Sequence, residues 1–308
     1  MHELWELKQK QNLPLSEKID ISLDLIREWY EYWKGQVYVS FSGGKDSTVL
    51  LDLVRKISID IPAVFVDTGL EYPEVKDFVK TKENVIYLRP KMNFRQVIEK
   101  YGYPFPSKEQ AAFIQEYKTT QSEKLRNIRL NGNKWNRGKI SKKWLYLIDA
   151  PFMVSDKCCD IMKKAPIKKY EKETGRHPII GTMACESDQR QSNWQMYGCN
   201  AFTKKRPTSQ PLSFWTEQDI LMYIKQNDLN YASVYGDIIQ NNNDEYITTK
   251  CERTGCMFCM FGCHFEKEPN RFQKMKITHP KLYDYCLRDW DAGGLGIKNV
   301  LDYINVKY

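Results

Sequence analysis

The chain has 308 residues, 42% hydrophobic and 28% charged, which is ordinary for a folded soluble protein. No apolar run is long enough to span a membrane, and the first ten residues hold no secretory apolar core, so we expect a cytoplasmic protein without a membrane partner. Nine cysteines are too few for a disulfide scaffold and several are clustered, which indicates metal ligation or redox chemistry, while the net charge of +8 is compatible with an anionic partner.

The first predicted elements are a helix, a strand and a second helix. Residues 16–35 carry a mostly apolar stripe and predict a helix that ends at Gly35. The apolar run 37–41 predicts a buried strand, and residues 48–54 predict a helix with its apolar face inward.

The turn between this strand and this helix reads Ser40-Phe41-Ser42-Gly43-Gly44-Lys45-Asp46-Ser47. Two glycines let the backbone bend sharply and approach a ligand, and the free N–H groups of a first helical turn attract an anion. With the serine hydroxyls and the charge of Lys45, we expect a phosphate or pyrophosphate here. The spacing is not that of a Walker A loop. It resembles the PP-loop of ATP pyrophosphatases, which split ATP into AMP and pyrophosphate; the alternative is a turn that happens to use two glycines.

The next predicted strand, residues 62–66, ends at a carboxylate. Asp67 would face the crevice where ligands bind in open α/β sheets, so it could hold Mg²⁺ or a ribose, and a helix cap or turn residue is the alternative. Residues 72–82 and 94–101 predict helices, and residues 85–88 predict a third strand. Strands that alternate with helices predict an α/β fold with a doubly wound parallel sheet.

A strand followed by S-F-S-G-G-K-D-S, and a second strand followed by D-T-G-x-E-Y-P-E, are similar to the phosphoadenylylsulfate (PAPS) reductase family. The resemblance implies an adenine nucleotide alpha-hydrolase fold that binds ATP or another adenine nucleotide with Mg²⁺. On this resemblance two loops would contact the nucleotide, through Ser40, Ser42, Gly43, Gly44, Lys45, Asp46, Ser47, Asp67, Thr68 and Gly69.

Residues 107–150 interrupt this alternation with a basic insertion. Its basic residues are interleaved with Trp135 and Trp144, and those in the range 118–143 are Lys118, Lys124, Arg126, Arg129, Lys134, Arg137, Lys139, Lys142 and Lys143. Basic groups with aromatic residues suit a phosphate backbone with stackable bases, so nucleic acid is a candidate partner. A solvated loop or helix face is the alternative.

Two groups of cysteines follow. The stretch 157–166 resembles the C-C-x-x-x-K-x-x-P signature of the adenylylsulfate (APS) reductase branch, where tandem cysteines ligate a [4Fe-4S] cluster. Further on, a C-x-x-C spacing presents two thiolates to one metal or cluster. The resemblance implies four ligands, which are Cys158, Cys159, Cys256 and Cys259. One alternative is a local Zn²⁺ or cluster site made by Cys251, Cys256, Cys259 and Cys263. In another, Cys263 replaces one of the tandem pair.

The stretch 181–190 follows a predicted strand at 179–180 and is similar to the family's G-x-x-x-x-E-S-x-x-R. The resemblance would place Glu186 and Arg190 at the crevice, and the bidentate fork of Arg190 suits an anion clamp, although a surface arginine is the alternative. Three cysteines outside the clusters are predicted to be small core residues, namely Cys185, Cys199 and Cys286.

Residues 265–308 are predicted to be mostly helical, with one helix from His279 through Trp290 and another at 300–304. Reductases of the family carry a nucleophilic cysteine in a C-terminal tail, and here no cysteine follows Cys286. Because attack on sulfur needs an activated thiolate, we expect that this chain does not reduce APS or PAPS.

We therefore expect a PP-loop nucleotide-binding α/β domain at 1–245 and a cysteine-rich helical region at 246–308. The expected enzyme is an ATP-dependent sulfurtransferase that adenylates an acceptor such as a nucleic acid with release of pyrophosphate and uses a [4Fe-4S] cluster. Sulfur from a donor protein or small thiol then replaces AMP. Lys45, Asp67 and Arg190 are the expected catalytic residues. The alternatives are a sulfonucleotide reductase and a non-catalytic protein that binds nucleotide and cluster.

Overall fold

The computed structural model describes residues 2–308, which form two compact units. Unit 1 contains the residues up to Asp67, together with Glu71–Arg89 and Ile167–Thr254. Unit 2 contains Thr68–Leu70, Pro90–Pro166 and Gly255–Tyr308. Segments of the two units alternate along the chain, whereas the two predicted domains are consecutive. The domain boundary between residues 245 and 246 stays a prediction.

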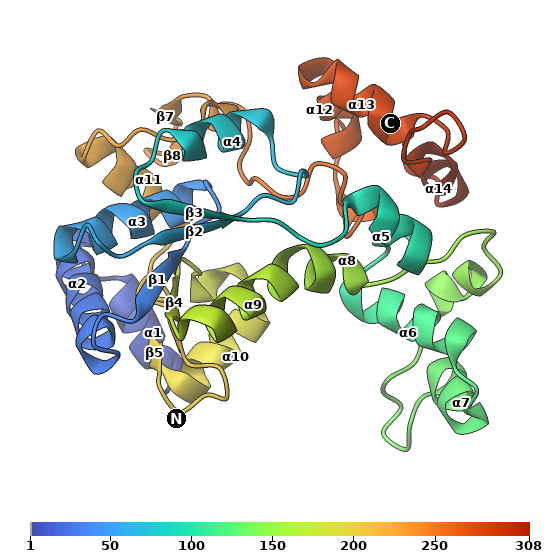
Figure 1. Cartoon of the computed structure of the whole chain (residues 1–308), viewed down its shortest axis with the longest axis horizontal. Coiled ribbons are helices and arrows are strands. Elements are labelled where there is room, and N and C mark those ends of the chain that lie inside the picture. The colour runs from blue at the N-terminus through green and yellow to red at the C-terminus, as the bar shows by residue number, and fades with distance from the viewer. Residues whose placement is uncertain (1) are drawn as a thin grey trace. The chain divides into compact units, whose positions relative to one another are not determined.

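Unit 1 is built on a six-stranded sheet with the order β3-β2-β1-β4-β6-β5 (Figure 1). The strands are β1 Val37–Ser40, β2 Ala63–Val66, β3 Val85–Leu88, β4 His177–Ile180, β5 Asn200–Ala201 and β6 Thr208–Ser209. All neighbouring pairs are parallel except β5 with β6. The central strand β1 pairs with β2 on one side and β4 on the other, so the carboxyl ends of these three strands meet at one edge of the sheet.

Helices cover both faces of this sheet, which confirms the predicted doubly wound α/β class. The helices of unit 1 are α1 Leu4–Gln11, α2 Leu15–Tyr32, α3 Lys45–Ile57, α4 Pro73–Lys80, most of α9 Ala165–Thr174, α10 Asp188–Tyr197 and α11 Glu217–Gln226; a small hairpin joins β7 Ile238–Gln240 to β8 Tyr246–Thr248. Val37 and Val39 point into the larger core, while Tyr38 points to the opposite face and packs on Tyr170 of α9 with ring centroids 5.3 Å apart.

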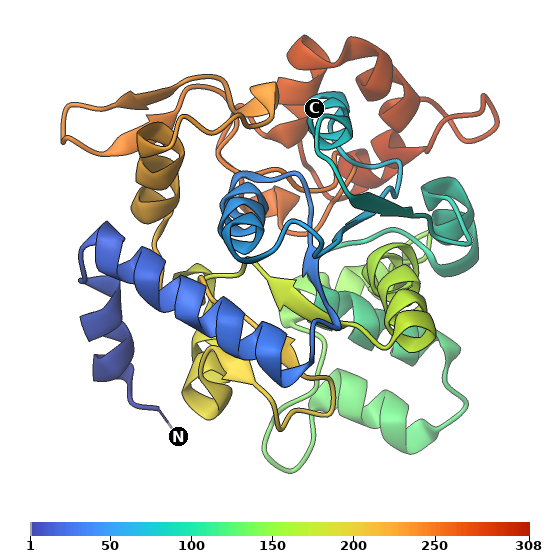
Figure 2. The same cartoon turned by 60° about the vertical axis from the view of Figure 1, so that its left-hand side comes forward.

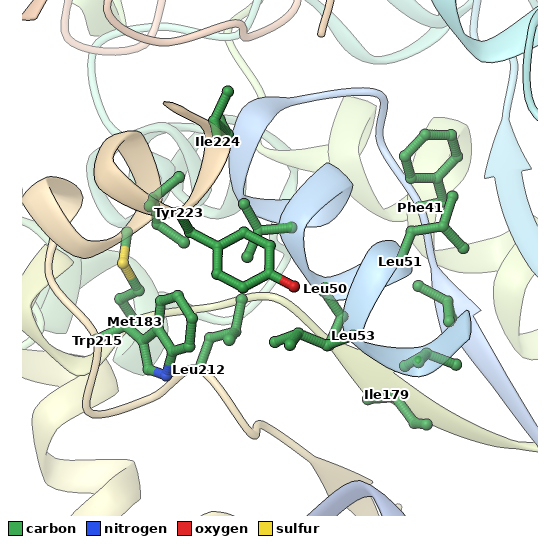
Figure 3. Packing of buried hydrophobic residues seen from close by; sticks show 14 of the residues in the cluster. Phe41, Leu50, Leu51, Leu53, Ile179, Met183, Leu212, Trp215, Tyr223 and Ile224 are labelled. Atoms are coloured by element: carbon green, nitrogen blue, oxygen red, sulfur yellow. The ribbon is translucent and has the colours of Figure 1, made fainter. Parts of the chain in front are cut away.

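The larger core holds α3 in place. The long helix α2 runs beside α3 (Figure 2), and α11 packs on α3 as well. Figure 3 shows Leu50 and Leu53 of α3 beside Tyr223 of α11, and all three side chains are fully buried. Thr216 caps α11, because its side chain accepts a hydrogen bond from the third backbone N–H of the helix. This packing fixes the amino end of α3, which follows the glycine turn.

Unit 2 is mostly helical, as expected for its C-terminal part. Its helices are α5 Phe94–Tyr101, α6 Lys108–Thr119, α7 Glu123–Asn131, α8 Lys157–Cys159, α12 Arg271–Thr278, α13 Pro280–Leu287 and α14 Ile297–Tyr303. The predicted extension of α13 through Trp290 is wrong, because Arg288 is extended with ψ 142° and ends the helix. Within residues 2–308, none of the helices is both long and apolar enough to cross a membrane.

Candidate nucleotide site and cysteine cluster

The predicted phosphate loop lies between β1 and α3, at the carboxyl edge of the sheet in unit 1. Gly44 is the N-cap of α3, which begins at Lys45, and Gly43 adopts a left-handed backbone with φ +72°. A Cβ atom at Gly43 would lie 2.7 Å from a methyl carbon of Val75 and 2.7 Å from one of Val79. Both the backbone angle and the space therefore require glycine at this position.

Two serine hydroxyls hold the turn closed. The Ser42 N–H donates to Ser47 Oγ at 3.2 Å, and the two hydroxyl oxygens are 3.0 Å apart. The Gly44 N–H donates to Ser42 Oγ at 3.3 Å, and the Ser47 hydroxyl donates to the Gly44 carbonyl at 2.9 Å. Ser40 ends β1 just before this turn. The donors expected to bind a phosphate are thus gathered at the amino end of one helix.

Lys45 is buried, and its partners come from far along the chain. Its N–H donates to the Tyr235 hydroxyl at 3.2 Å, and its ammonium group lies 2.7 Å from the Glu217 carboxylate and donates to the Glu252 carbonyl. The Tyr235 hydroxyl also lies 2.8 Å from Thr254 Oγ1. Burial raises the pKa of Tyr235 to about 12, so it stays a neutral hydrogen-bonding group. The sequence of the glycine turn, residues 40–47, did not predict that Glu217 and Tyr235 contact Lys45.

Asp46 stands in the first turn of α3 with one buried oxygen, Oδ1, that has no hydrogen-bond partner within residues 2–308. Burial raises the pKa of this carboxyl group, while the charge of Lys45 opposes the rise. A buried carboxylate oxygen without a partner is unfavourable, and a hard cation such as Mg²⁺ relieves that penalty. The donor type therefore fits a nucleotide-bound Mg²⁺ at this position.

Asp67 follows β2 and lines a pocket of about 460 Å³ in unit 1, whose walls are Phe65, Asp67, Lys76, Lys80, Tyr87 and Arg89. Its Oδ1 is 3.0 Å from Lys76 Nζ and its Oδ2 is 3.8 Å from Arg89 Nε. Two cations so close to one carboxylate suit a hydrogen bond to a ribose better than the binding of Mg²⁺. Thr68 and Gly69 belong to unit 2, where Thr68 Oγ1 accepts a hydrogen bond from the Leu70 N–H at 3.2 Å.

The predicted pair Glu186 and Arg190 forms an ion pair in unit 1, between the 3-10 turn Ala184–Glu186 and α10. A third residue, Arg253, which sequence reasoning missed, lies 3.5 Å from the other Glu186 oxygen. Burial and the charge of Arg253 lower the pKa of Arg190, and Asp46 acts in the opposite direction. One carboxylate thus holds both guanidinium groups, and Arg253 precedes Thr254, whose Oγ1 is 2.8 Å from the Tyr235 hydroxyl that accepts from the Lys45 N–H. Both cations would favour an anion at the phosphate loop.

Cys185 is exposed, so the prediction that it is a core residue is wrong. Its neighbour Ala184 is buried, and the tight 3-10 turn presents the next side chain outward. Partial burial of the sulfur raises the pKa of Cys185. The positive charge of Arg253 lowers this pKa, and the carboxylate of Asp46 raises it further. The segment that carries Cys185 passes beside the phosphate loop, because a Cβ placed on Gly181 would lie 3.1 Å from the Asp46 carbonyl oxygen. The other two predicted core cysteines, Cys199 and Cys286, are buried as expected.

The four thiols predicted as cluster ligands all lie in unit 2. Cys158 Sγ is 3.9 Å from Cys159 Sγ at the end of α8, just before a π-helical turn, an uncommon element that is frequent at functional sites. The hydrogen bond to Cys159, burial, and the charges of Cys159, Cys259 and Cys256 raise the pKa of Cys158. The same hydrogen bond and three lysines lower the pKa of Cys159 to about 6.

A backbone turn joins Cys256 and Cys259, because the Cys259 N–H donates to the Cys256 carbonyl at 3.1 Å. Within residues 2–308, however, no group of three His, Cys, Asp or Glu side chains stands close enough to hold a metal ion. The four thiols fit an iron–sulfur cluster by donor type, because cysteine thiolates hold the irons of such clusters, and Cys256 and Cys259 lie close enough to Cys158 for their charges to raise its pKa. Among the alternative ligands, Cys263 is buried in unit 2 and Cys251 belongs to unit 1. The ligand set stays a prediction.

A family model described as the phosphoadenosine phosphosulfate reductase domain matches residues 36–139 and 107–261. Uncharacterized protein MJ0973 of Methanocaldococcus jannaschii is 27% identical over 286 residues, which cover 90% of this chain and 53% of that protein. The chain thus spans about half the length of this relative, and a second protein of the same organism is covered to 43%.

The adenosine 5'-phosphosulfate reductase of Geobacillus kaustophilus is 24% identical to this chain, and the match covers 75% of the chain and 80% of that enzyme. Among solved structures, the U34-tRNA thiolase NcsA of Methanococcus maripaludis with its [4Fe-4S] cluster matches 95% of this chain and 82% of its own, at 13% identity and a TM-score of 0.37.

Proposed function

Because the chain belongs to the phosphoadenosine phosphosulfate reductase domain family, we propose that it is an ATP-dependent sulfurtransferase that activates its acceptor by adenylation. The observation that carries this proposal is the closed phosphate loop at the amino end of α3, with Lys45 buried beneath it and Arg190 and Arg253 nearby. Such an arrangement suits the triphosphate of ATP, because the N–H groups of the first helical turn and the three cations would all attract its negative charge.

The nucleotide would bind with its phosphates over the turn from Ser42 to Ser47. A phosphate would then compete with the Glu217 carboxylate for the Lys45 ammonium, which is 2.7 Å from that carboxylate. Asp46 would hold the accompanying Mg²⁺ through its unpartnered oxygen. The ribose would lie toward Asp67, at the carboxyl end of β2.

The reaction would proceed in two displacements. An oxygen of the acceptor attacks the α-phosphorus of ATP, the bond to the β-phosphate oxygen breaks, and pyrophosphate leaves. A sulfur nucleophile from the donor then attacks the acceptor carbon, the carbon–oxygen bond breaks, and AMP leaves with the electron pair. Arg190 and Arg253 would stabilise the negative charge that develops on the α-phosphate, which is electrostatic catalysis by fixed donors.

The cysteine cluster of unit 2 would hold a [4Fe-4S] cluster through Cys158, Cys159, Cys256 and Cys259. When bound, such a cluster supplies redox chemistry or an iron that binds sulfur. This chain's own contribution is the electrostatic environment, in which Lys108, Lys163 and Lys164 favour the thiolate of Cys159. The positive surroundings therefore stabilise the anionic form that iron requires.

A second candidate function, reduction of a sulfonucleotide, is favoured by one specific observation. Cys185 presents an exposed thiol beside the phosphate loop, and a thiolate is the nucleophile that such a reduction needs. The curated relative from Geobacillus kaustophilus is named as an adenosine 5'-phosphosulfate reductase. In the third candidate, a non-catalytic binding protein, neither reaction would occur.

The test offers the purified protein ATP with candidate acceptors in one assay, and APS or PAPS with a dithiol reductant in another. We expect pyrophosphate release that depends on the acceptor and is lost in a Lys45→Ala, Ser47→Ala double variant. Lys225→Ala, an exposed lysine of α11 in the same unit, is the matched control and should keep full activity. Sulfite production at an enzymatic rate would instead establish the reductase, and no turnover in either assay would support the binding protein.

A further inference from the structure

The net positive charge of the chain comes from one short segment. Residues 118–143 contain nine of the 47 basic residues and one of the 39 acidic residues, which is a net charge of +8. The rest of the chain then holds 38 residues of each sign and has no net charge. Such a local excess repels itself, so it indicates an anionic partner rather than an average solvated surface.

These cations are mostly left without acidic partners. Within residues 2–308, Arg129 is the one basic residue of the segment that pairs with a carboxylate, that of Glu116, at 2.5 Å. Arg129 also donates to the Gly138 carbonyl at 2.6 Å, so its role is to hold the following loop. Lys118 donates to the carbonyl of Ala150 at 3.2 Å. Six of the remaining cations are exposed, namely Lys124, Arg126, Lys134, Arg137, Lys142 and Lys143.

The loop after α7 displays an aromatic ring in the middle of this charge. Trp135 is 67% exposed, and the Lys134 ammonium lies 4.2 Å from the centre of its ring. The Asn133 side chain accepts hydrogen bonds from the N–H groups of Trp135 at 2.9 Å and Arg137 at 3.0 Å, and the Asn133 N–H donates to the Arg137 carbonyl at 2.8 Å. The loop is therefore a built turn that presents the ring to solvent.

A second exposed ring lies at the other end of the segment. Phe265 is 71% exposed, and the Lys143 ammonium lies 5.0 Å from its ring centre. Lys143 is also 5.0 Å from the ring of Trp144, which is buried. In both places a large apolar ring is exposed to water beside a lysine, and burial of such a ring against a flat partner is favourable.

We propose that residues 118–143, together with Phe265, bind single-stranded nucleic acid. The exposed lysines and arginines neutralise backbone phosphates, and unpaired bases stack on Trp135 and Phe265. A duplex would satisfy the charges but would not offer free base faces, since its bases are already stacked. The role of the nucleic acid as acceptor rests on the proposed function. Its binding to residues 118–143 and Phe265 does not depend on that function.

The experiment measures binding of a fluorescent single-stranded RNA, a single-stranded DNA and a duplex of the same sequence to the full chain, over a range of salt concentrations. Trp135→Ala should weaken binding of the single strands roughly 5- to 150-fold, the effect of losing one stacked base. Trp5→Ala is the matched control, because Trp5 is 63% exposed but lies on α1 in the other unit. It should leave binding unchanged.

The charge is tested by a triple glutamine variant of Lys124, Lys134 and Arg137. Each lost phosphate contact should reduce the slope of log affinity against log salt by about 0.7, so the slope should become shallower by about 2. The control is a triple glutamine variant of Lys168, Lys172 and Lys225, which are exposed in unit 1 and should leave the slope unchanged.

Equal effects of the two triple variants, or a Trp135→Ala protein that binds single strands normally, would overturn the inference. Equal binding of the duplex and the single strands would overturn it too, because stacking would then contribute nothing. A different result would show that the proposed function is wrong while the binding inference holds. In that case single strands would bind as described, with the expected variant effects, but would not stimulate pyrophosphate release from ATP.

Discussion

Replacement of Gly43 by alanine tests whether the phosphate loop has the geometry described. The left-handed backbone, φ +72°, costs an alanine about 1–2 kcal/mol. The new methyl group would also lie 2.7 Å from methyl carbons of Val75 and Val79, well inside the usual contact distance, and such overpacking costs about 1–3 kcal/mol more. We therefore expect Gly43→Ala to lower the free energy of unfolding by about 2–5 kcal/mol.

Gly175 provides a matched control in the same unit. It has nearly the same backbone angle, φ +69°, but no atom lies within 4 Å of a Cβ placed there. Gly175→Ala should therefore lose only the backbone share, about 1–2 kcal/mol. Urea unfolding of both variants, followed by tryptophan fluorescence, measures the difference. In a Val79→Ala background the Gly43→Ala change should cost less, because one of the two close contacts is gone. Equal losses for the two glycine variants would refute the reasoning.

Single residues give three further predictions. A thiol reagent should label Cys185 and not Cys199, and ATP should slow the labelling, as measured by peptide mass spectrometry; undiminished labelling would place Cys185 away from the nucleotide. Because burial raises the pKa of Asp46, its ionised form lowers the free energy of unfolding once the pH exceeds that pKa. Asp46→Asn should restore this free energy at neutral pH, and it should weaken Mg²⁺-dependent ATP binding at least tenfold by calorimetry. Unchanged ATP affinity would contradict the assignment of Asp46 to Mg²⁺. Anaerobically prepared protein should contain about four irons per chain by elemental analysis, lost in Cys159→Ala and kept in Cys286→Ala; zinc, or iron kept without Cys159, would favour another ligand set.

The local features of the site could be predicted from the sequence. The turn at Gly43 and Gly44 is defined by neighbouring residues, because the strand, the glycines and the helix are consecutive. The same holds for the cap of α11 at Thr216. Patterns over a few residues also predicted strands β1 to β3, because each is a short apolar run; β1 and β2 are mostly buried in the parallel sheet, and β3 lies at its edge.

The surroundings of these motifs could not be predicted. Glu217, Tyr235 and Arg253 reach the phosphate loop from more than 170 residues away, and no short pattern marks them. Cys185 was predicted wrongly for a similar reason. A cysteine outside a cluster usually lies in a core, but the 3-10 turn at 184–186 points this one outward. Its exposure depends on tertiary structure, which composition does not reveal.

Transfer of the α-phosphate label of ATP tests the central claim most directly. The protein is incubated with ATP labelled at the α-phosphorus and a single-stranded RNA acceptor, without a sulfur donor, so that the second displacement cannot occur. We predict that label appears in the RNA in equal amount to the pyrophosphate released, and that neither appears with the Lys45→Ala, Ser47→Ala variant. Release of inorganic phosphate with formation of labelled ADP, or pyrophosphate release that leaves all label in free AMP at every acceptor concentration, would contradict adenylation of the acceptor.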